Sequence, residues 1–190
     1  MVKHSLHQRF FIALVPPPEI QAEANAIKQY FSDRYQSRAA HRSPPHITLQ
    51  APFEWPLAAL PELTTALAQF ASQQPGVSVV LNGFAAFPPR VIYIDVCPAP
   101  PLLLLQAQLT EYLHQILALS SSRPSRAFVP HLTVAFRDLT KANFAAAWAE
   151  FRDRPLNYTF TAEALTLLQH DGQRWLIAAA YPLLSGKQER

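Results

Sequence analysis

The stretch Pro45-His46-Ile47-Thr48-Leu49 has a counterpart later in the chain, Pro130-His131-Leu132-Thr133-Val134. Both follow the pattern His, apolar, Thr, apolar. Successive side chains of a β-strand point to opposite faces, so the two apolar residues of each copy are expected in a core. The His and the Thr then stand side by side on the other face. Each copy therefore predicts an imidazole and a hydroxyl on one rigid surface, and two such pairs facing each other can hold an anion between them.

The repetition matters more than either copy. A single motif of this length is more often a structural strand His beside a common strand Thr. Only seven His occur in the chain, and both copies follow a Pro, nearly half the chain apart. We therefore interpret the pair as functional.

Composition limits the function classes. With 190 residues, 49% hydrophobic and 15% charged, the chain is expected to fold around a large core. A net charge of +3 suits an anionic substrate but does not indicate an extended nucleic-acid surface. The single cysteine, Cys97, excludes an internal disulfide and a cysteine zinc cluster. No signal peptide or membrane-spanning run is recognised, so a cytoplasmic location without a membrane partner is expected.

Hydrophobic periodicity predicts an α+β fold in which one order of elements occurs twice. That order is helix, loop, His-Thr strand, helix and two strands. Helices are expected at 18–35, 58–73, 102–119 and 141–151, and strands at 9–15, 46–52, 77–87, 91–96, 128–137, 156–170 and 173–181. A Ser-rich basic loop is expected at 120–126 and a polar tail at 185–190. We interpret residues 1–190 as a single bilobal domain of two similar α/β lobes with mainly antiparallel sheets and an active cleft between them. The alternative is two unrelated α+β pieces.

Two histidines suit acid/base chemistry on a phosphodiester. One takes a proton from an attacking water or hydroxyl, the other gives a proton to the departing oxygen, and the Thr hydroxyls donate to the non-bridging oxygens. This scheme needs no metal, and no zinc-ligand pattern occurs. No Gly-rich phosphate loop occurs either, so no nucleotide cofactor is predicted.

The paired motif resembles the 2H phosphoesterase superfamily, and within it the 2′-5′ RNA ligase-like and cyclic phosphodiesterase branch. The resemblance covers almost the whole chain and includes the segments 9–14, 45–53 and 128–137. It implies a pseudo-twofold fold and metal-independent action on 2′,3′-cyclic phosphates or 2′-5′ linkages. The expected substrates are RNA ends or small cyclic nucleotides, and no obligatory protein partner is evident. By this resemblance His46 and His131 are the acid/base pair, and Thr48 and Thr133 hold the phosphate.

Four further residues are weaker candidates for substrate binding. If the motif strands continue, Gln50 and Arg137 share faces with the His-Thr pairs, and Arg137 is either a second phosphate ligand or a solvated strand-end charge. Phe53 and Tyr93 either stack a base or belong to the core. Two other functions stay open: joining of RNA ends through a 2′-5′ bond, and nucleotide binding without turnover. Spacing does not tell which His is the acid.

Overall fold

Eight strands form two antiparallel sheets in the computed structural model, which describes residues 6–119 and 127–184. The first sheet has the order β2-β1-β7-β8 and the second the order β5-β4-β3-β6. The strands of the first are β1 (His7–Leu14), β2 (Ile47–Pro56), β7 (Ala164–His170) and β8 (Trp175–Pro182). Those of the second are β3 (Val77–Phe87), β4 (Val91–Val96), β5 (His131–Ala135) and β6 (Asn157–Ala162). Each motif strand therefore forms an edge of its sheet.

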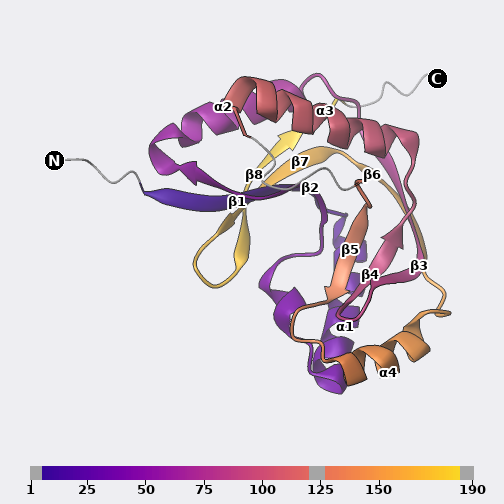
Figure 1. The fold of residues 1–190 in the computed structure, drawn as a ribbon. Coiled ribbons are helices and arrows are strands. Elements are labelled where there is room, and N and C mark those ends of the chain that lie inside the picture. Colours follow the sequence, from indigo (N-terminus) through magenta and orange to yellow (C-terminus); the bar gives the residue numbers. More distant parts are fainter. Residues whose placement is uncertain (1–5, 120–126, 185–190) are drawn as a thin grey trace, which may run out of the picture.

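Two helices cover one face of each sheet (Figure 1). Helices α2 (Leu60–Ala71) and α3 (Pro100–Leu117) contact the first sheet, and α1 (Pro18–Tyr35) and α4 (Lys141–Phe151) contact the second. Helix α1 begins with Pro at its first position, where the missing N–H is not needed. Its buried stripe includes Ile20, Ala24, Ile27 and Phe31. None of the helices within the described ranges is long and apolar enough to cross a membrane.

The two halves of the chain exchange strands. The order strand, helix, motif strand, helix, strand runs once from β1 to β3 and again from β4 to β6. Strand β3 leaves the first half and pairs with β4 in the sheet of the second motif, whereas β7 returns to pair with β1. The expected two-lobed α+β fold with antiparallel sheets is confirmed, but each lobe contains strands from both halves.

The predicted strand 156–170 is two strands, which is the main correction to the predicted elements. Strand β6 ends at Ala162 and pairs with β3, and β7 starts at Ala164 and pairs with β1. Only Glu163 separates them, and no Gly, Pro or Asn marks the change of sheet. The predicted helices 18–35 and 141–151 and strands 77–87 and 91–96 are confirmed at their bounds. The predicted loop 120–126 and tail 185–190 lie outside the described residues.

One continuous core joins the helices to the covered faces of both sheets. Phe10, Ile12 and Leu14 of β1 belong to it, as do Ile92 and Ile94 of β4. The uncovered faces are composed differently. On the first sheet, Phe11, Ala13 and Leu168 form a small separate cluster to which Trp175 packs. The candidate catalytic residues lie on these uncovered faces.

Candidate active site

Strand β2 presents the first His-Thr pair as the alternation predicts. Ile47 and Leu49 are buried in the core, while Thr48 on the other face is half-buried. His46 directly precedes the strand and is also half-buried. The alternation is possible here because β2 is covered on only one face.

Strand β5 repeats this arrangement. Leu132 and Val134 are fully buried, and His131 and Thr133 are half-buried on the opposite face. Thr133 lies directly across from Tyr93 of the neighbouring strand β4. Both copies of the motif therefore place one imidazole and one hydroxyl on an accessible face.

The tertiary structure brings the two motifs together. Strands β2 and β5 are edge strands of different sheets, and they contact each other. His131 lies close enough to His46 to act electrostatically on its pKa. The two His-Thr pairs, nearly half a chain apart in sequence, therefore meet where the lobes meet.

Both imidazoles make the same hydrogen bond. His46 Nδ1 lies 2.7 Å from the carbonyl oxygen of Pro44, and His131 Nδ1 lies 2.7 Å from that of Val129. A carbonyl only accepts, so Nδ1 carries the proton in each ring. In a neutral ring Nε2 is then the nitrogen with the free lone pair. Each imidazole is thus oriented by a main-chain group two residues upstream, which leaves Nε2 as the titrating atom.

Aromatic rings support both histidines from the strand next to the motif strand. The ring of Phe11 on β1 lies 4.7 Å from the His46 ring, and that of Tyr93 on β4 lies 5.2 Å from the His131 ring. Phe87 contacts both Tyr93 and His131. Burial, together with the nearby Asp95 carboxylate, raises the pKa of Tyr93. The supporting rings restrict how far each imidazole can rotate.

A buried lysine stands behind the first histidine. Lys28 of α1 is 1% exposed, and its Nζ donates to the carbonyl of Ser43 at 3.0 Å, just ahead of His46. Burial lowers the pKa of Lys28 to about 8. Burial also lowers the pKa of His46 to about 4, and the nearby charges of Lys28 and His131 act in the same direction. His46 is therefore neutral at pH 7.

The four weaker candidates for substrate binding differ in where the structure places them. Gln50 is half-buried on β2, but an irregularity in the strand register separates it from Thr48, so that Thr48 lies across from Ala13 and Gln50 across from Ile12. Phe53 packs against the core beside Phe10, with ring centroids 6.3 Å apart. Tyr93 contacts His131, but at 5% exposure it offers little surface to a base. Strand β5 ends at Ala135, before Arg137 is reached. Arg137 therefore does not share the strand face of His131 and Thr133.

Arg137 has a different position from the one assumed in the sequence argument. Its backbone is left-handed with φ +61°, which turns the chain away from the strand direction. Its guanidinium lies over the ring of Phe136, 5.2 Å from the centroid. The neighbouring Asp138 accepts hydrogen bonds from the backbone N–H groups of Arg38 and Ala39, and so anchors the loop that leads towards His46.

Sequence reasoning missed two neighbours of His46. Phe11 lies in a run of consecutive apolar residues, and such a run does not indicate which face of the strand the helices cover. Lys28 carried a usable signal, because it lies four residues after Ala24 and three before Phe31 on the buried stripe of α1. A lysine in that position is buried only when a partner receives its ammonium group, and here the partner is the loop before His46.

Comparison with known proteins identifies the family. A family model described as the 2′-5′ RNA ligase superfamily matches residues 16–174, which include both His-Thr motifs. The chain belongs to this superfamily. The expectation drawn from the paired motifs is thereby confirmed.

Proteins of known sequence or structure resemble the chain over nearly its whole length. A Geobacillus kaustophilus protein named "Putative phosphoesterase" is 28% identical over 183 residues, which are 95% of this chain and 98% of that protein. The structure of Escherichia coli LigT complexed with 3′-AMP has a TM-score of 0.68 at 21% identity and covers 94% of this chain and 99% of its own. TT0787 of Thermus thermophilus has a TM-score of 0.66 at 20% identity, covering 92% and 97%. These two structures share the fold of this superfamily member.

Proposed function

We propose that the protein is a phosphoesterase that opens 2′,3′-cyclic phosphates or cleaves 2′-5′ phosphodiesters of RNA or nucleotides, with His46 and His131 as the acid/base pair. The observation that carries the proposal is the matched hydrogen bonding of the two rings, whose Nδ1 atoms both donate to main-chain carbonyls at 2.7 Å. Binding alone needs phosphate donors but not two oriented titrating groups. The arrangement therefore favours turnover over a binding module.

His46 is the general base in this proposal. With its pKa lowered to about 4 by burial, its Nε2 is unprotonated at neutral pH and accepts the proton of the attacking water. The water oxygen bonds to phosphorus, and the bond from phosphorus to one ribose oxygen breaks. His131 acts in its charged form, in which Nε2 also carries a proton, and gives that proton to the departing oxygen, so a cyclic phosphate becomes a monoester. Thr48 and Thr133 donate to the non-bridging oxygens, where charge increases in the transition state. End joining would run the related steps in reverse.

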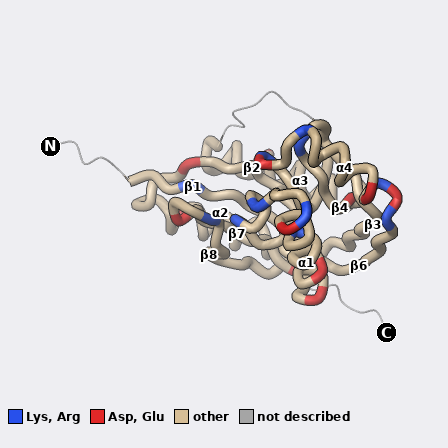
Figure 2. Tube along the Cα trace, turned by 90° about the horizontal axis from the view of Figure 1, so that it is seen from below, with Lys and Arg blue, Asp and Glu red and all other residues tan. Residues whose placement is uncertain are grey.

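Nucleotides are the proposed substrate class. The superfamily is described by its action on RNA, and the LigT fold relative has been crystallised with 3′-AMP. The charge pattern agrees with a small or single-stranded ligand. Over residues 6–119 and 127–184, charged residues are sparse, Lys and Arg are interspersed with Asp and Glu, and no extended segment of one sign is visible (Figure 2). Phosphate groups are therefore expected to bind at local clusters of donors.

A substrate panel tests the function. We expect turnover of 2′,3′-cyclic mononucleotides or of 2′-5′ dinucleotides in excess EDTA, since the proposed steps use only side chains of the protein. ADP-ribose 1″,2″-cyclic phosphate and 3′-5′ dinucleotides complete the panel. The wild type and a His46/His131 double variant are assayed in parallel. Activity that requires an added divalent metal would contradict the mechanism, and tight binding of substrates without turnover would favour the binding module.

The pH dependence tests the assignment of the base. A free His with an ordinary pKa of 6.5 would lose its base form below that pH. Because the pKa of His46 is lowered to about 4, its base form persists down to about pH 4, and the acidic limb of kcat/KM is expected near there. The measurement is kcat/KM between pH 3.5 and 9, with the His46 ring followed in parallel by NMR. An acidic limb near pH 6.5 that follows His46 would assign the base role elsewhere.

A further inference from the structure

A row of side chains leads away from His46 along the uncovered face of the first sheet. The ring centroid of Phe11 lies 4.7 Å from that of His46, and the ring centroid of Trp175 on β8 lies 4.7 Å from that of Phe11. His170 of β7 lies 4.8 Å from Trp175, and the guanidinium of Arg9 lies over the Trp175 ring at 5.4 Å. Three consecutive contacts therefore connect the proposed catalytic base to a basic pair at the far end of the same face.

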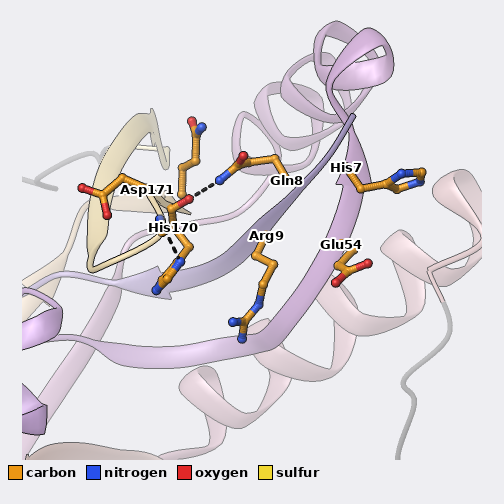
Figure 3. A pocket seen from close by; sticks show the side chains of 8 residues that line it. His7, Gln8, Arg9, Glu54, His170 and Asp171 are labelled. Atoms are coloured by element: carbon orange, nitrogen blue, oxygen red, sulfur yellow. Dashed lines mark hydrogen bonds between the residues drawn. The ribbon is translucent and has the colours of Figure 1, made fainter. Parts of the chain in front are cut away.

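An open groove of about 520 Å³ lies at this end. Its lining includes Arg9 and His170 but neither His46 nor His131. Figure 3 shows the Arg9 and His170 side chains extending to the same side of β1, while Gln8 extends to the other. The groove is thus separate from the two His-Thr pairs, although the ring contacts join it to them.

The hydrogen bonds of His170 give it an outward donor. Its Nδ1 accepts from the backbone N–H of Gly172 at 3.1 Å. Nε2 therefore carries the proton in the neutral ring, the reverse of the arrangement in His46 and His131. The backbone carbonyl of His170 accepts from the Gln8 side chain, which holds the strand end. His170 is a donor whether its ring is neutral or charged.

The Arg9 side chain packs on an aromatic ring, but none of the ion pairs among the described residues neutralises its charge. Its guanidinium lies over Trp175, which leaves the N–H groups at its edge able to donate. Glu54 is its cross-strand neighbour, yet no ion pair within 4 Å joins the two among the residues that the structure describes. Asp171 also lines the groove, but it accepts from the backbone of Gln173 and Arg174 in the hairpin turn. Arg9 and His170 therefore both present hydrogen-bond donors to the groove, beside the carboxylates of Glu54 and Asp171.

We propose that Arg9 and His170 bind a second phosphate of the substrate, one that lies outside the cleaved group. This proposal rests on the proposed function and narrows it, because such a phosphate exists in an oligonucleotide but not in a cyclic mononucleotide. The preferred substrates are then RNA ends longer than one nucleotide. Trp175 positions the guanidinium, and the row of rings keeps the two phosphate sites at a fixed separation.

The kinetic test compares substrates of different length. Mono-, di- and triadenylates ending in a 2′,3′-cyclic phosphate are assayed with the wild type, Arg9→Gln, His170→Gln and Glu54→Gln. The measured quantity is the ratio of kcat/KM on the triadenylate to kcat/KM on the mononucleotide. We expect this ratio to fall about tenfold in Arg9→Gln, because a charge-assisted hydrogen bond is lost. The ratio should also fall in His170→Gln and should rise in Glu54→Gln, where the competing carboxylate is removed.

Arg174→Gln is the matched control. It removes the same charge from the adjacent hairpin, and Arg174 pairs with Asp171 at 3.7 Å without lining the groove. The ratio is expected to stay at the wild-type value in this variant. Equal falls in Arg9→Gln and Arg174→Gln would show a general charge effect and overturn the site, as would an unchanged ratio in Arg9→Gln.

A binding measurement separates this proposal from the proposed function. Triadenylate with a terminal 3′-phosphate is titrated calorimetrically into the His46→Asn/His131→Asn variant, with and without Arg9→Gln. We expect about tenfold weaker binding without Arg9, and a salt slope that is smaller by about 0.7. Arg9-dependent binding by a protein that turns over no substrate would support the phosphate site while the proposed function fails. Turnover of mononucleotides without any Arg9 effect would leave the function standing and overturn the site.

Discussion

His46→Asn and His131→Asn are each expected to lower kcat about 10³-fold or more, within the range that positioned acids and bases contribute. Asparagine is chosen because its side-chain amide can still donate to the carbonyl that Nδ1 now contacts, Pro44 in one copy and Val129 in the other. The substitution removes Nε2 together with the rest of the ring, while a donor to the main-chain carbonyl is kept. Loss of activity with the local hydrogen bond kept would therefore report on proton transfer.

The measurement is kcat and KM on the best substrate of the panel, with thermal melting of each variant to show that the fold is intact. His114→Asn is the control, because His114 is exposed in the last turn of α3 and belongs to neither motif. The double variant should lose little more than either single variant, since both groups act in one step. Full activity of either single variant would refute the two-histidine mechanism.

Thr48→Val and Thr133→Val are each expected to lower kcat by about 10²-fold, as removal of one donor to a developing oxyanion does. Valine keeps the shape and the strand preference of threonine, and both side chains lie half-buried on strands that would keep their pairing. The effect should fall mainly on kcat, because the hydroxyls are proposed to bind the transition state more strongly than the ground state.

Serine variants at the same two positions provide the control for the hydroxyl. Thr48→Ser and Thr133→Ser should keep most of the activity, whereas Thr159→Val, on an exposed position of β6, should not change it. If valine and serine variants behave alike at either position, then the methyl group and not the hydroxyl is important there. That result would remove the residue from the proposed phosphate site.

The architecture around the site depends on information that local patterns do not contain. Periodicity reports which residues share a face of one strand, and it predicted the alternation in β2 and β5 correctly. It does not report which sheet a strand joins. Apolar and polar residues alternate from Leu156 across Glu163 to Ala164, yet the run 156–170 divides into β6 and β7 because each part pairs with a distant strand. Long-range pairing, not local preference, made this choice.

The amino-acid sequence by itself determined the two His-Thr pairs, their presentation on strands, and the superfamily to which the chain belongs. Only the tertiary structure decided that the pairs meet, since contact between β2 and β5 requires both sheets. It also decided the environment of His46, because Lys28 of α1 and the His131 side chain come from distant segments. The same holds for the groove lined by Arg9 and His170, which are 161 positions apart and become neighbours only when β1 pairs with β7. Chemistry that depends on residue type is readable locally, whereas pKa shifts and ligand sites depend on burial and proximity, which exist only in the folded chain.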